Sequence, residues 1–586
     1  MATDNASNDS LAHNRHTLAH LLAAAIADLY PHAKPTIGPA IDTGFYYDFD
    51  FKGGPVPGAD HLTEIQKKML ALLPQWTDFT HKEVSADEAR SMFVNNEYKI
   101  ELINEIEKAG EVITLYTCGG FTDLCRGGHA EHPSKDIAAD SFLLDKVAGA
   151  YWRGDEKNPM LTRIYGLAYN SKTELDAYVM QREEAIKRDH RKIGKELDLF
   201  LTSELVGAGL PLWTPRGTIL RNALDGYIWE LREKHGYQRV TIPHITKKDL
   251  YEKSGHWAKF SDELFRITTR EGKEYALKPM NCPHHTQIFD RKPHSYREMP
   301  QRYAETTTVY RDEQSGELGG LTRVLSITQD DSHVFCRHNQ VRDEFFKIWD
   351  IVDTFYSTFG FKLRVRLSFH DPKEMEKYLG TPEIWKNAED SLRSIAKERN
   401  ADYFEAEGEA AMYGPKLDFM ATDSMGRQHQ VATIQLDMNQ PERFDLTCTN
   451  EKGEKERIVM IHCAIMGSIE RFTAVLLEHT AGNLPLFLSP VQTVILPVSE
   501  KHSAYAEGIL TELKTLGIRA EIDNSDSLGK RIRAAKLFKV PYTIIVGDQE
   551  ITDSTATLES RDNGKVGALP IADIITRLSG EIKSRS

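Results

Sequence analysis

The sequence predicts a multidomain protein with α+β and α/β parts, and three observations lead to this expectation. The chain has 586 residues, and at roughly 100–200 residues per domain several hydrophobic cores are expected. Residues 171–193 form a helical pattern with dense, mixed charge, which is typical of an exposed connector between domains. The last hundred residues alternate strand-like and helical runs, as a small α/β domain does.

The N-terminal part begins with a polar segment and continues into a helix. Residues 1–12 have neither the basic start nor the apolar core of a secretory signal, and we expect a disordered lead-in there. From His16 the apolar residues recur at helical spacing, with Leu18 and Leu22 on one side. A second helix is expected after Ser171, because this serine and the glutamate three residues later have the spacing of a capping box.

The C-terminal domain is expected to begin near Leu488. Its sequence predicts a buried strand PVQTVILPV, a helix AYAEGILTELKTLG that ends at Gly517, a strand AEIDNS, a helix KRIRAAKLF and a strand PYTIIVGD. Alternating strands and helices of these lengths favour a mostly parallel sheet.

Composition restricts the class of protein. Hydrophobic residues make up 40% and charged residues 27%, as in an ordinary globular protein, and no apolar run is long enough to cross a bilayer. The net charge of −14 argues against a general nucleic-acid binder, although a local basic surface can still serve one partner. Six cysteines in so long a chain do not form a disulfide framework, so we expect reduced thiols and a cytoplasmic location.

The central part carries a set of arginine-containing segments. The segment YRDE (310–313) is followed by a glycine-containing turn and Arg323. An arginine beside a carboxylate suits an adenylate-forming site: Arg311 would clamp the α-phosphate, and Glu313 would accept from the adenine amino group. Taken alone, this sequence equally suits an ordinary surface ion pair. Downstream, GSIER (467–471) opens an apolar helix, and upstream a long helix precedes GYQRVTIP (236–243).

In this order the three segments resemble motifs 1, 2 and 3 of the class II aminoacyl-tRNA synthetases. The resemblance implies a catalytic core with an antiparallel sheet, an ATP site with its Mg²⁺, and a homodimer built by motif 1. Arg471 would lie over the nucleotide and pair with its phosphates, whereas alone it would be a charge on a helix surface.

Three residues in locally unusual segments can form a metal site. Cys282 in KPMNCPHH, His333 in TQDDSHVFC and His462 in VMIHCAIMG offer one thiolate and two imidazoles. This donor set suits zinc with an open fourth position. The wide spacing leaves alternatives among neighbouring residues, namely His284, His285, Cys336 and Cys463.

These segments resemble the threonyl-tRNA synthetases, and the similarity extends from His16 to the C-terminus. In that family one zinc per chain, held by Cys-His-His, binds the amino and hydroxyl groups of threonine; an apolar pocket alone would separate threonine from valine only by roughly a hundredfold. The resemblance also implies that His256 helps to deprotonate the acceptor hydroxyl of tRNA(Thr). The implied catalytic residues are Arg311, Arg471, His256 and Lys416; the ATP-binding residues are Arg311, Glu313, Arg323, Gln430, Thr433 and Arg471; the threonine-binding residues are Met280, Gln329, Asp331, Tyr413, Gln435 and Ser468.

The N-terminal part contains a second candidate site. His16 and His20 share one helix face, and Cys125 and His129 follow at the same spacing of four. A zinc site and a set of inert, packed side chains both fit this pattern, whereas a metalloprotease is disfavoured because HTLAH lacks the glutamate of HExxH. Bacterial-type threonyl-tRNA synthetases use a domain with this motif to hydrolyse serine wrongly attached to tRNA(Thr), and the resemblance implies the same activity here without a metal. The matching residues are His16, His20, Cys125, His129, Asp123, Lys99 and Tyr47.

The C-terminal domain resembles the anticodon-binding domain shared by several class II synthetases. Arg533 and Glu550 match positions that contact anticodon bases, although Arg533 equally suits a plain surface charge. Ser525 lies in SDSLG where the family has NEKIG, and Glu559 replaces an arginine; a carboxylate there would repel phosphate. A third departure is Ile327, where the family has an aromatic residue stacked on adenine, and we expect weaker stacking without a loss of function.

The expected domains are a lead-in (1–12), an editing domain (13–170), a helical linker (171–193), a class II catalytic domain (194–487) and an anticodon-binding domain (488–586). The small ubiquitin-like domain with which bacterial members begin is expected to be absent, since only residues 1–15 precede His16. A tRNA-binding paralogue without catalysis is disfavoured because the arginines and zinc ligands are present. The metal triad and the N-terminal pairs disfavour a prolyl- or seryl-specific enzyme, and the intact nucleotide motifs disfavour a free-standing deacylase.

Overall fold

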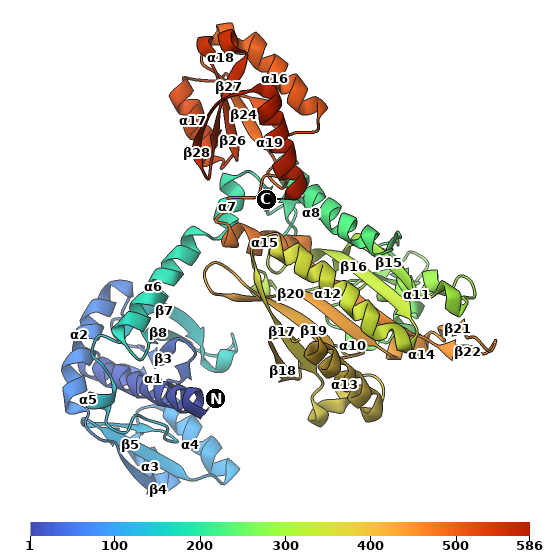
Figure 1. Cartoon of the computed structure of the whole chain (residues 1–586). Coiled ribbons are helices and arrows are strands. Elements are labelled where there is room, and N and C mark those ends of the chain that lie inside the picture. The colour runs from blue at the N-terminus through green and yellow to red at the C-terminus, as the bar shows by residue number, and fades with distance from the viewer. Residues whose placement is uncertain (1, 586) are drawn as a thin grey trace. The chain divides into compact units, whose positions relative to one another are not determined.

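The computed structural model describes residues 2–585, apart from the side chains of residues 2–9 and of Ser315. The chain forms two compact units, one ending at Glu183 and the other beginning at Glu184, within helix α6 (Lys172–Lys187). In the part of the chain that the structure describes, no helix is both long and apolar enough to cross a membrane. Figure 1 labels the helices and strands along the chain.

The N-terminal unit combines helices with two antiparallel sheets, so the predicted α+β class is confirmed. The larger sheet has the order β1-β3-β8-β7, with β2 paired to β3, and the smaller sheet has the order β4-β5-β6. The strands are β1 (Lys34–Pro35), β2 (Ala40–Ile41), β3 (Gly44–Asp50), β4 (Thr80–Val84), β5 (Ile113–Cys118), β6 (Phe121–Leu124), β7 (Phe142–Tyr151) and β8 (Met160–Ala168). The helices are α1 (Ala2–Leu29), α2 (Leu62–Leu72), α3 (Ala86–Met92), α4 (Glu97–Ala109) and α5 (Pro133–Asp136).

Helix α1 packs its apolar side against the larger sheet (Figure 1). Leu18 and Leu22 are fully buried in one core with Phe45 and Phe49 of β3, which confirms the helix predicted from His16. The predicted disordered lead-in is wrong for its described part, because the helix already begins at Ala2. No proline or glycine interrupts this segment, and extending an existing helix adds one backbone hydrogen bond for each residue fixed.

The helix predicted after Ser171 is α6, and its N-terminus is capped much as expected. The backbone N–H of Glu174 donates to Oγ of Ser171 at 3.3 Å. The carboxylate of Glu174 accepts from the backbone N–H of Asn170 at 3.1 Å, one residue earlier than a standard capping box places it.

The second unit is built around an eight-stranded sheet with the order β11-β15-β16-β23-β20-β19-β17-β18. All neighbouring strands are antiparallel except the pairs β11–β15 and β17–β18, which confirms the antiparallel core. The strands are β11 (Gln238–Arg239), β15 (Gln301–Tyr310), β16 (Ser326–Cys336), β17 (Lys362–Phe369), β18 (Tyr403–Glu407), β19 (Lys416–Thr422), β20 (Gln428–Asp437) and β23 (Val459–Ala464).

The two faces of this sheet have different roles. Helices α8 (Pro215–Lys234), α12 (Val341–Ser357) and α15 (Ile469–His479) share one hydrophobic core with it (Figure 1). Val334, Leu417 and Ile461 of the sheet are buried in that core. Because successive strand residues point to opposite faces, the alternate residues His333 and His462 point to the other face.

Strand register arranges the candidate site residues of this other face in two rows. Successive cross-strand partners in the first row are His333, His462, Gln435 and Lys416. Those in the second row are Asp331, Ala464, Thr433 and Asp418. Strand β20 has one extra residue, Val431, opposite the step from Phe419 to Met420. This bulge brings Gln430 to the same face as Thr433, although they are three positions apart in the sequence and a regular strand would point them to opposite faces.

Smaller elements complete the part of the second unit that contains the eight-stranded sheet. The short strands are β9 (Phe200–Leu201), β10 (Leu212–Trp213), β12 (Ile245–Lys247), β13 (Arg266–Thr268), β14 (Glu274–Leu277), β21 (Thr447–Thr449) and β22 (Lys455–Arg457). The remaining helices are α7 (His190–Glu196), α9 (Lys248–Ser254), α10 (His256–Lys259), α11 (Cys282–Phe289), α13 (Pro382–Glu398) and α14 (Asn439–Arg443).

The C-terminal α/β domain contains all five predicted elements. Its strands, in the spatial order β25-β24-β26-β27-β28, are β24 (Thr493–Pro497), β25 (Ala520–Ile522), β26 (Tyr542–Val546), β27 (Thr555–Ser560) and β28 (Gly564–Pro570). Only the first three are parallel, so the expected mostly parallel sheet is wrong for β27 and β28. The short turn 561–563 between these two strands permits an antiparallel hairpin but no parallel crossover.

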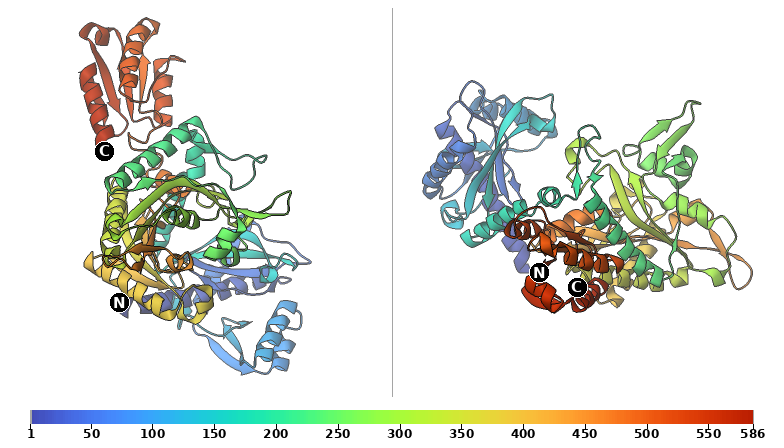
Figure 2. Two further views of the ribbon diagram at one scale, coloured as in Figure 1. Left: turned by 90° about the vertical axis from the view of Figure 1, so that its right-hand side faces the viewer. Right: turned by 90° about the horizontal axis from the view of Figure 1, so that it is seen from above.

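Helices cover both faces of this C-terminal sheet (Figure 2). Helices α16 (Ser503–Thr515) and α19 (Ile571–Ser584) pack in the core that contains Ile495 and Ile544. Helix α17 (Leu528–Leu537) packs on the other face, with Val494 and Leu496. The alternation of these neighbouring residues between two cores explains why the strands are apolar throughout.

Candidate active sites

The rows of the eight-stranded sheet border a cavity of about 170 Å³. Its volume lies below the roughly 300 Å³ of the smallest pockets for drug-sized ligands, so it suits a molecule of amino-acid size. Predicted residues that line it are Met280, Cys282, Arg311, Gln329, Asp331, His333, Tyr413, Thr433, Gln435 and His462. The sequence-based expectation for this pocket and the observed cavity therefore agree in most of their residues.

The predicted metal triad comes together beside this cavity. The ligand atoms of Cys282, His333 and His462 all lie within 4.8 Å of one another, and the three side chains are buried. Nε2 of His333 is 3.1 Å from Nδ1 of His462. Two nitrogens at this separation can both reach one ion at the roughly 2.0–2.1 Å typical of zinc. Among the described residues, none of the alternatives His284, His285, Cys336 and Cys463 belongs to this cluster.

The outer nitrogens of the two histidines are already engaged. Nδ1 of His333 lies 2.7 Å from Nδ1 of His285, and Nε2 of His462 lies 2.8 Å from the carboxylate of Asp437. The inner nitrogens therefore face the Cys282 thiol, as in metal sites whose histidines are oriented by a second partner. Burial raises the pKa of the Cys282 thiol and lowers that of His333, each well away from its ordinary value.

Polar contacts order the walls of the same cavity. The hydroxyl of Tyr413 donates to Gln435 at 2.5 Å, and its ring stacks on His462 with 4.6 Å between centroids. Asn281 donates to Asp331 at 2.9 Å. Ser468 is buried at the N-cap of α15 and accepts from the backbone of Arg471, so its role in the structure is to start the helix, and it does not line the cavity.

The buried carboxylate of Asp418 connects several predicted residues, and the sequence interpretation missed it. It accepts from Gln430 at 2.9 Å and from Thr433 at 2.7 Å, and Nζ of Lys416 lies 3.5 Å away. Arg366 also donates to Asp418, at 3.0 Å. The predicted catalytic residue Lys416 of β19 and the predicted ATP-binding residues Gln430 and Thr433 of β20 therefore surround one fully buried charge.

The arginines of motifs 2 and 3 differ in their partners. Arg311 lines the cavity, and its Nε is buried without a hydrogen-bond acceptor, which leaves an unsatisfied donor beside the cavity. Arg323 forms an ion pair with Glu313 at 2.7 Å. Arg471 is exposed on the first turn of α15. Ile327 is half-buried opposite Val309.

His256 is placed differently from the other predicted catalytic residues. Its ring is fully buried, with Nδ1 2.8 Å from Oγ of Ser254 and Nε2 3.7 Å from Sγ of Cys282. Burial lowers the pKa of His256 to about 3, so its imidazole is neutral near pH 7. His256 does not line the cavity, and the triad residue that it contacts is Cys282.

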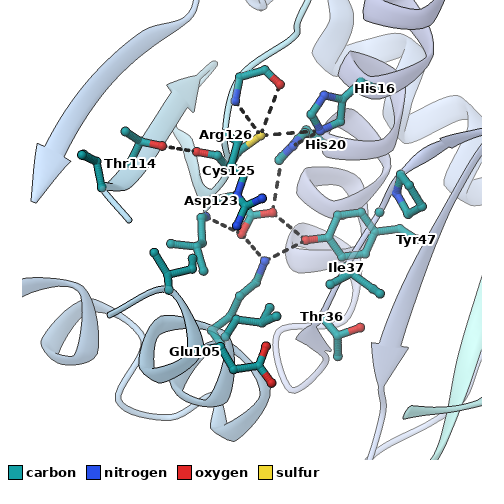
Figure 3. A pocket seen from close by; sticks show the side chains of 18 of the residues that line it. His16, His20, Thr36, Ile37, Tyr47, Glu105, Thr114, Asp123, Cys125 and Arg126 are labelled. Carbon is teal, nitrogen blue, oxygen red and sulfur yellow. Dashed lines mark hydrogen bonds and ion pairs between the residues drawn. The ribbon is translucent and has the colours of Figure 1, made fainter. Parts of the chain in front are cut away.

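The second candidate site lies in the N-terminal unit, where α1, β3, α4 and the segment after β6 border a cavity of about 580 Å³ (Figure 3). Oδ2 of Asp123 lies 3.3 Å from His20 and accepts from Tyr47 at 2.5 Å. Oδ1 of the same carboxylate lies 2.5 Å from Nζ of Lys99. All four side chains are buried, so Asp123 holds the predicted residues of three elements together.

The remaining predicted residues of this site surround Cys125. Its Sγ lies 3.5 Å from Nε2 of His16 and 3.5 Å from Nε2 of His129. The ligand atoms of His16, His20, Cys125 and His129 all lie within 4.8 Å of one another, so the geometry fits a metal as well as a hydrolytic site. His129 does not line the cavity, and its ring stacks between those of His16 and Phe79.

Charges in this cluster are strongly coupled. Burial raises the pKa of the Cys125 thiol, but hydrogen bonds from His129, His16 and His20 outweigh it and lower the pKa to about 4. Burial lowers the pKa of His20, but Asp123 and Cys125 outweigh it and raise the pKa to about 9. Near pH 7 the site therefore combines a thiolate with a charged imidazole beside a carboxylate.

The predicted anticodon residues have unequal surroundings. Arg533 is exposed on α17. Glu550 accepts from the backbone N–H of Gly547 at 2.9 Å and from Thr557 at 2.8 Å, so it orders the start of α18 (Asp548–Asp553). Glu559 pairs with Lys536 at 3.3 Å, and Arg561 donates to two backbone carbonyls, of Leu484 and Lys539.

Comparison with known proteins assigns the chain to a family. Residues 265–480 match the model of the tRNA synthetase class II core domain (G, H, P, S and T), and residues 492–581 match the anticodon binding domain. Residues 113–165 match the threonyl and alanyl tRNA synthetase second additional domain. Fold, sites and matches together define a class II aminoacyl-tRNA synthetase.

Relatives identify the family within this class. The threonine–tRNA ligase of Porphyromonas gingivalis is 48% identical over 574 residues, which are 97% of this chain and 87% of the relative. That of Synechocystis sp. is 43% identical over 586 residues, 98% of this chain and 96% of the relative. The crystal structure of the RNA binding domain of threonyl-tRNA synthetase from Cryptosporidium parvum is 39% identical, with a TM-score of 0.64 over 67% of this chain and 98% of that chain. The chain belongs to the threonine–tRNA ligase family.

Proposed function

We propose that the cavity beside the Cys282–His333–His462 triad activates threonine with ATP and transfers it to tRNA(Thr). The observation that carries this proposal is the strand register, which brings His333, His462 and Gln435 of three adjacent strands to one small cavity. Cys282 at the start of α11 and Arg311 complete the wall of this cavity. Such a site can hold an amino acid by its polar groups while a neighbouring arginine holds the phosphate that it attacks.

The donor set of the triad fits zinc, and we assign Cys282, His333 and His462 as its ligands. When bound, zinc supplies an open position for the amino and hydroxyl groups of threonine. Asp437 and His285 support this assignment, because they fix the histidine nitrogens that face the thiol. Asp331 would accept from the amino group of the substrate, and Met280, Gln329, Tyr413, Gln435 and Ser468 would complete or support the pocket.

ATP would lie next to this pocket, along the rows of the sheet. Arg311 would stabilise the charge that develops on the α-phosphate when the threonine carboxylate attacks phosphorus and diphosphate leaves with Mg²⁺. Nε of Arg311 supports this role, because it has no hydrogen-bond acceptor and its nearest charged partner, Glu263, is 4.0 Å away. Glu313 and Arg323 would contact the adenine side, Arg471 the terminal phosphates, and Lys416, Gln430 and Thr433 the ribose and α-phosphate, held in place by Asp418.

The transfer step needs a group that accepts a proton from the tRNA hydroxyl. His256 has the neutral imidazole of a base, but its burial behind Cys282 means that it would act through a water or through a local rearrangement. In that step the ribose oxygen attacks the carbonyl carbon of the adenylate, and AMP leaves.

We propose that the N-terminal cavity hydrolyses seryl-tRNA(Thr), with water attacking the ester carbonyl and releasing serine. The charged His20 beside Asp123 would stabilise the negative oxygen of the intermediate. The Cys125 thiolate would accept a hydrogen bond from the water, while His16 and His129 order this thiolate. Lys99 and Tyr47 would order Asp123. Such a second site would remove serine, which carries the same hydroxyl as threonine and is smaller.

The wider assignments follow the same family. Residues 13–170 would form the editing domain, 171–193 the linker, 194–487 the catalytic domain and 488–586 the anticodon-binding domain. Arg533 would be available to the anticodon because it is exposed, whereas Glu550 would mainly order its loop. We also propose a homodimer through motif 1 and a cytoplasmic location.

Two single-site variants separate the proposed activities. Cys282→Ser should abolish charging of tRNA(Thr) with threonine and leave hydrolysis of seryl-tRNA(Thr) unchanged. His20→Ala should abolish hydrolysis of seryl-tRNA(Thr) and leave charging with threonine unchanged. If Cys282→Ser charges threonine as well as the wild type, the catalytic assignment is wrong. If His20→Ala still hydrolyses seryl-tRNA(Thr) at the wild-type rate, the editing assignment is wrong.

A further inference from the structure

His190, the first residue of α7, connects two segments of the second unit that are both distant from it in the sequence. Its Nδ1 lies 2.7 Å from Oε1 of Glu478, near the end of α15. Its Nε2 lies 3.0 Å from the backbone nitrogen of Leu321, within the loop that follows Arg311. The imidazole is only 7% exposed, so these contacts are shielded from water.

The two contacts define the protonation of the ring. The backbone N–H of Leu321 is a donor, so Nε2 of His190 must be the acceptor. The proton of the neutral imidazole is therefore on Nδ1, where it is donated to Glu478. Glu478 is fixed in turn by Arg427, whose Nη2 lies 2.6 Å from Oε2 of the glutamate. Oε1 of Glu478 also accepts a hydrogen bond from the backbone N–H of His190 at 3.2 Å.

The loop is shaped to receive this imidazole. Gly320 has a φ of +56°, and a Cβ built on it would lie 2.3 Å from Nε2 of His190. Glycine adopts this left-handed conformation more readily than other residues, and it alone has no Cβ to block the approach of the imidazole. The backbone N–H of Arg311 donates to the carbonyl of Leu325 at 3.1 Å and closes the base of the loop. His190 thus anchors the middle of a loop whose arms carry Arg311 and Arg323.

We propose that His190 is a positioning residue for ATP, which fixes the loop 311–325 against helix α7 and couples that helix to the nucleotide site. The proposal rests on the proposed function in one respect, namely that this loop holds ATP. A loop held in its binding conformation binds without a further loss of conformational entropy. The coupling is reciprocal, so a nucleotide that orders the loop also stabilises the contacts of α7.

Three variants at this position separate the two contacts. In His190→Gln the longer amide reaches the place of Nε2 and can accept from Leu321. In His190→Asn the shorter amide reaches only the place of Nδ1 and keeps the contact with Glu478. His190→Ala removes both contacts. The exposed His338 provides a matched control, His338→Ala, which touches neither segment.

The kinetic test measures KM for ATP and for threonine in threonine-dependent ATP–pyrophosphate exchange. His190→Ala and His190→Asn should raise KM for ATP by about 5- to 150-fold, the usual range of coupling between sites, and leave KM for threonine nearly unchanged. His190→Gln should recover most of the ATP affinity. If all three variants raise both KM values equally, the residue acts only on stability and the proposal fails.

Amide hydrogen exchange tests the contact without any substrate. The amide of Leu321 should exchange faster in His190→Ala and His190→Asn than in His190→Gln or His338→Ala, in full-length protein with an unchanged unfolding midpoint. If the protein activates no amino acid at all, the proposed function fails, yet this exchange still decides whether His190 holds the loop. Equal Leu321 exchange in every variant would overturn the proposal.

Discussion

Asp437 lies 2.8 Å from Nε2 of His462 and fixes which nitrogen of that imidazole faces the cavity. The aspartate is fully buried, and its other oxygen accepts the backbone N–H groups of Asn439 and Gln440 at 2.8 and 2.9 Å. Helix α14 therefore holds the carboxylate, and the carboxylate holds the proposed ligand. The orientation of His462 therefore depends on a residue that does not itself line the cavity.

Replacement of this carboxylate should weaken the metal site. Asp437→Ala leaves Nε2 of His462 without its acceptor, so we expect zinc affinity to fall by roughly 10- to 100-fold. Competition with a chelating dye measures the affinity directly. The exposed Asp402→Asn is the control. Unchanged affinity in Asp437→Ala would show that His462 needs no orienting partner or is not a ligand.

Asp418 should be important for both stability and nucleotide binding. Asp418→Asn removes the charge that compensates Arg366 and Lys416 in a buried place, and breaking such a pair costs about 3–5 kcal/mol. We expect a lower free energy of unfolding in urea and at least a roughly tenfold higher KM for ATP, by loss of positioning. Zinc content should not change. A variant with wild-type KM for ATP would contradict the role of this group.

The Cys125 thiol should react as a thiolate in weak acid. Its pKa of about 4 means that the thiolate already dominates at pH 6, where an ordinary thiol is almost fully protonated. The rate of alkylation by iodoacetamide should therefore be nearly constant between pH 6 and pH 8, measured by mass spectrometry of the Cys125 peptide. The other five cysteines are buried and should react slowly. A rate that increases about tenfold per pH unit in this range would mean an ordinary thiol.

The carboxylate of Asp123 should be essential for hydrolysis but not for charging. Asp123→Asn removes the negative charge that keeps His20 protonated, and the amide cannot accept from His20, Lys99 and Tyr47 together. We expect hydrolysis of seryl-tRNA(Thr) to slow by about 10²- to 10⁴-fold, the range of general acid–base effects. Threonine charging should remain at the wild-type rate. The exposed Asp87→Asn serves as control, and loss of both activities would point to misfolding instead.

Much of the fold was predictable because apolar periodicity and connection lengths are local properties. The helix from His16, the helix after Ser171 and the five C-terminal elements were predicted correctly. The antiparallel strands β27 and β28 were not foreseen, because the prediction stopped at the parallel pattern before them. The start of α1 was missed because polar composition alone does not end a helix.

The site shows a similar division. The triad was predicted from residue types and from a resemblance, whereas Asp418 and Asp437 were missed. Both positions could have been found from the repeat of strand side chains. Strand side chains repeat every two residues, so Asp418 shares a face with Lys416, and Asp437 shares one with Gln435. His190 gave no such signal, because its partners lie 131 and 288 residues away in sequence.

The central claim is tested most directly by amino-acid-dependent ATP–pyrophosphate exchange with threonine, serine and valine, on protein assayed for zinc. We expect about one zinc per chain, strong exchange with threonine, weaker exchange with serine and none with valine, because valine lacks the hydroxyl that an open zinc position requires. Folded, zinc-loaded protein that shows no exchange with threonine, or equal exchange with threonine and valine, would contradict the account.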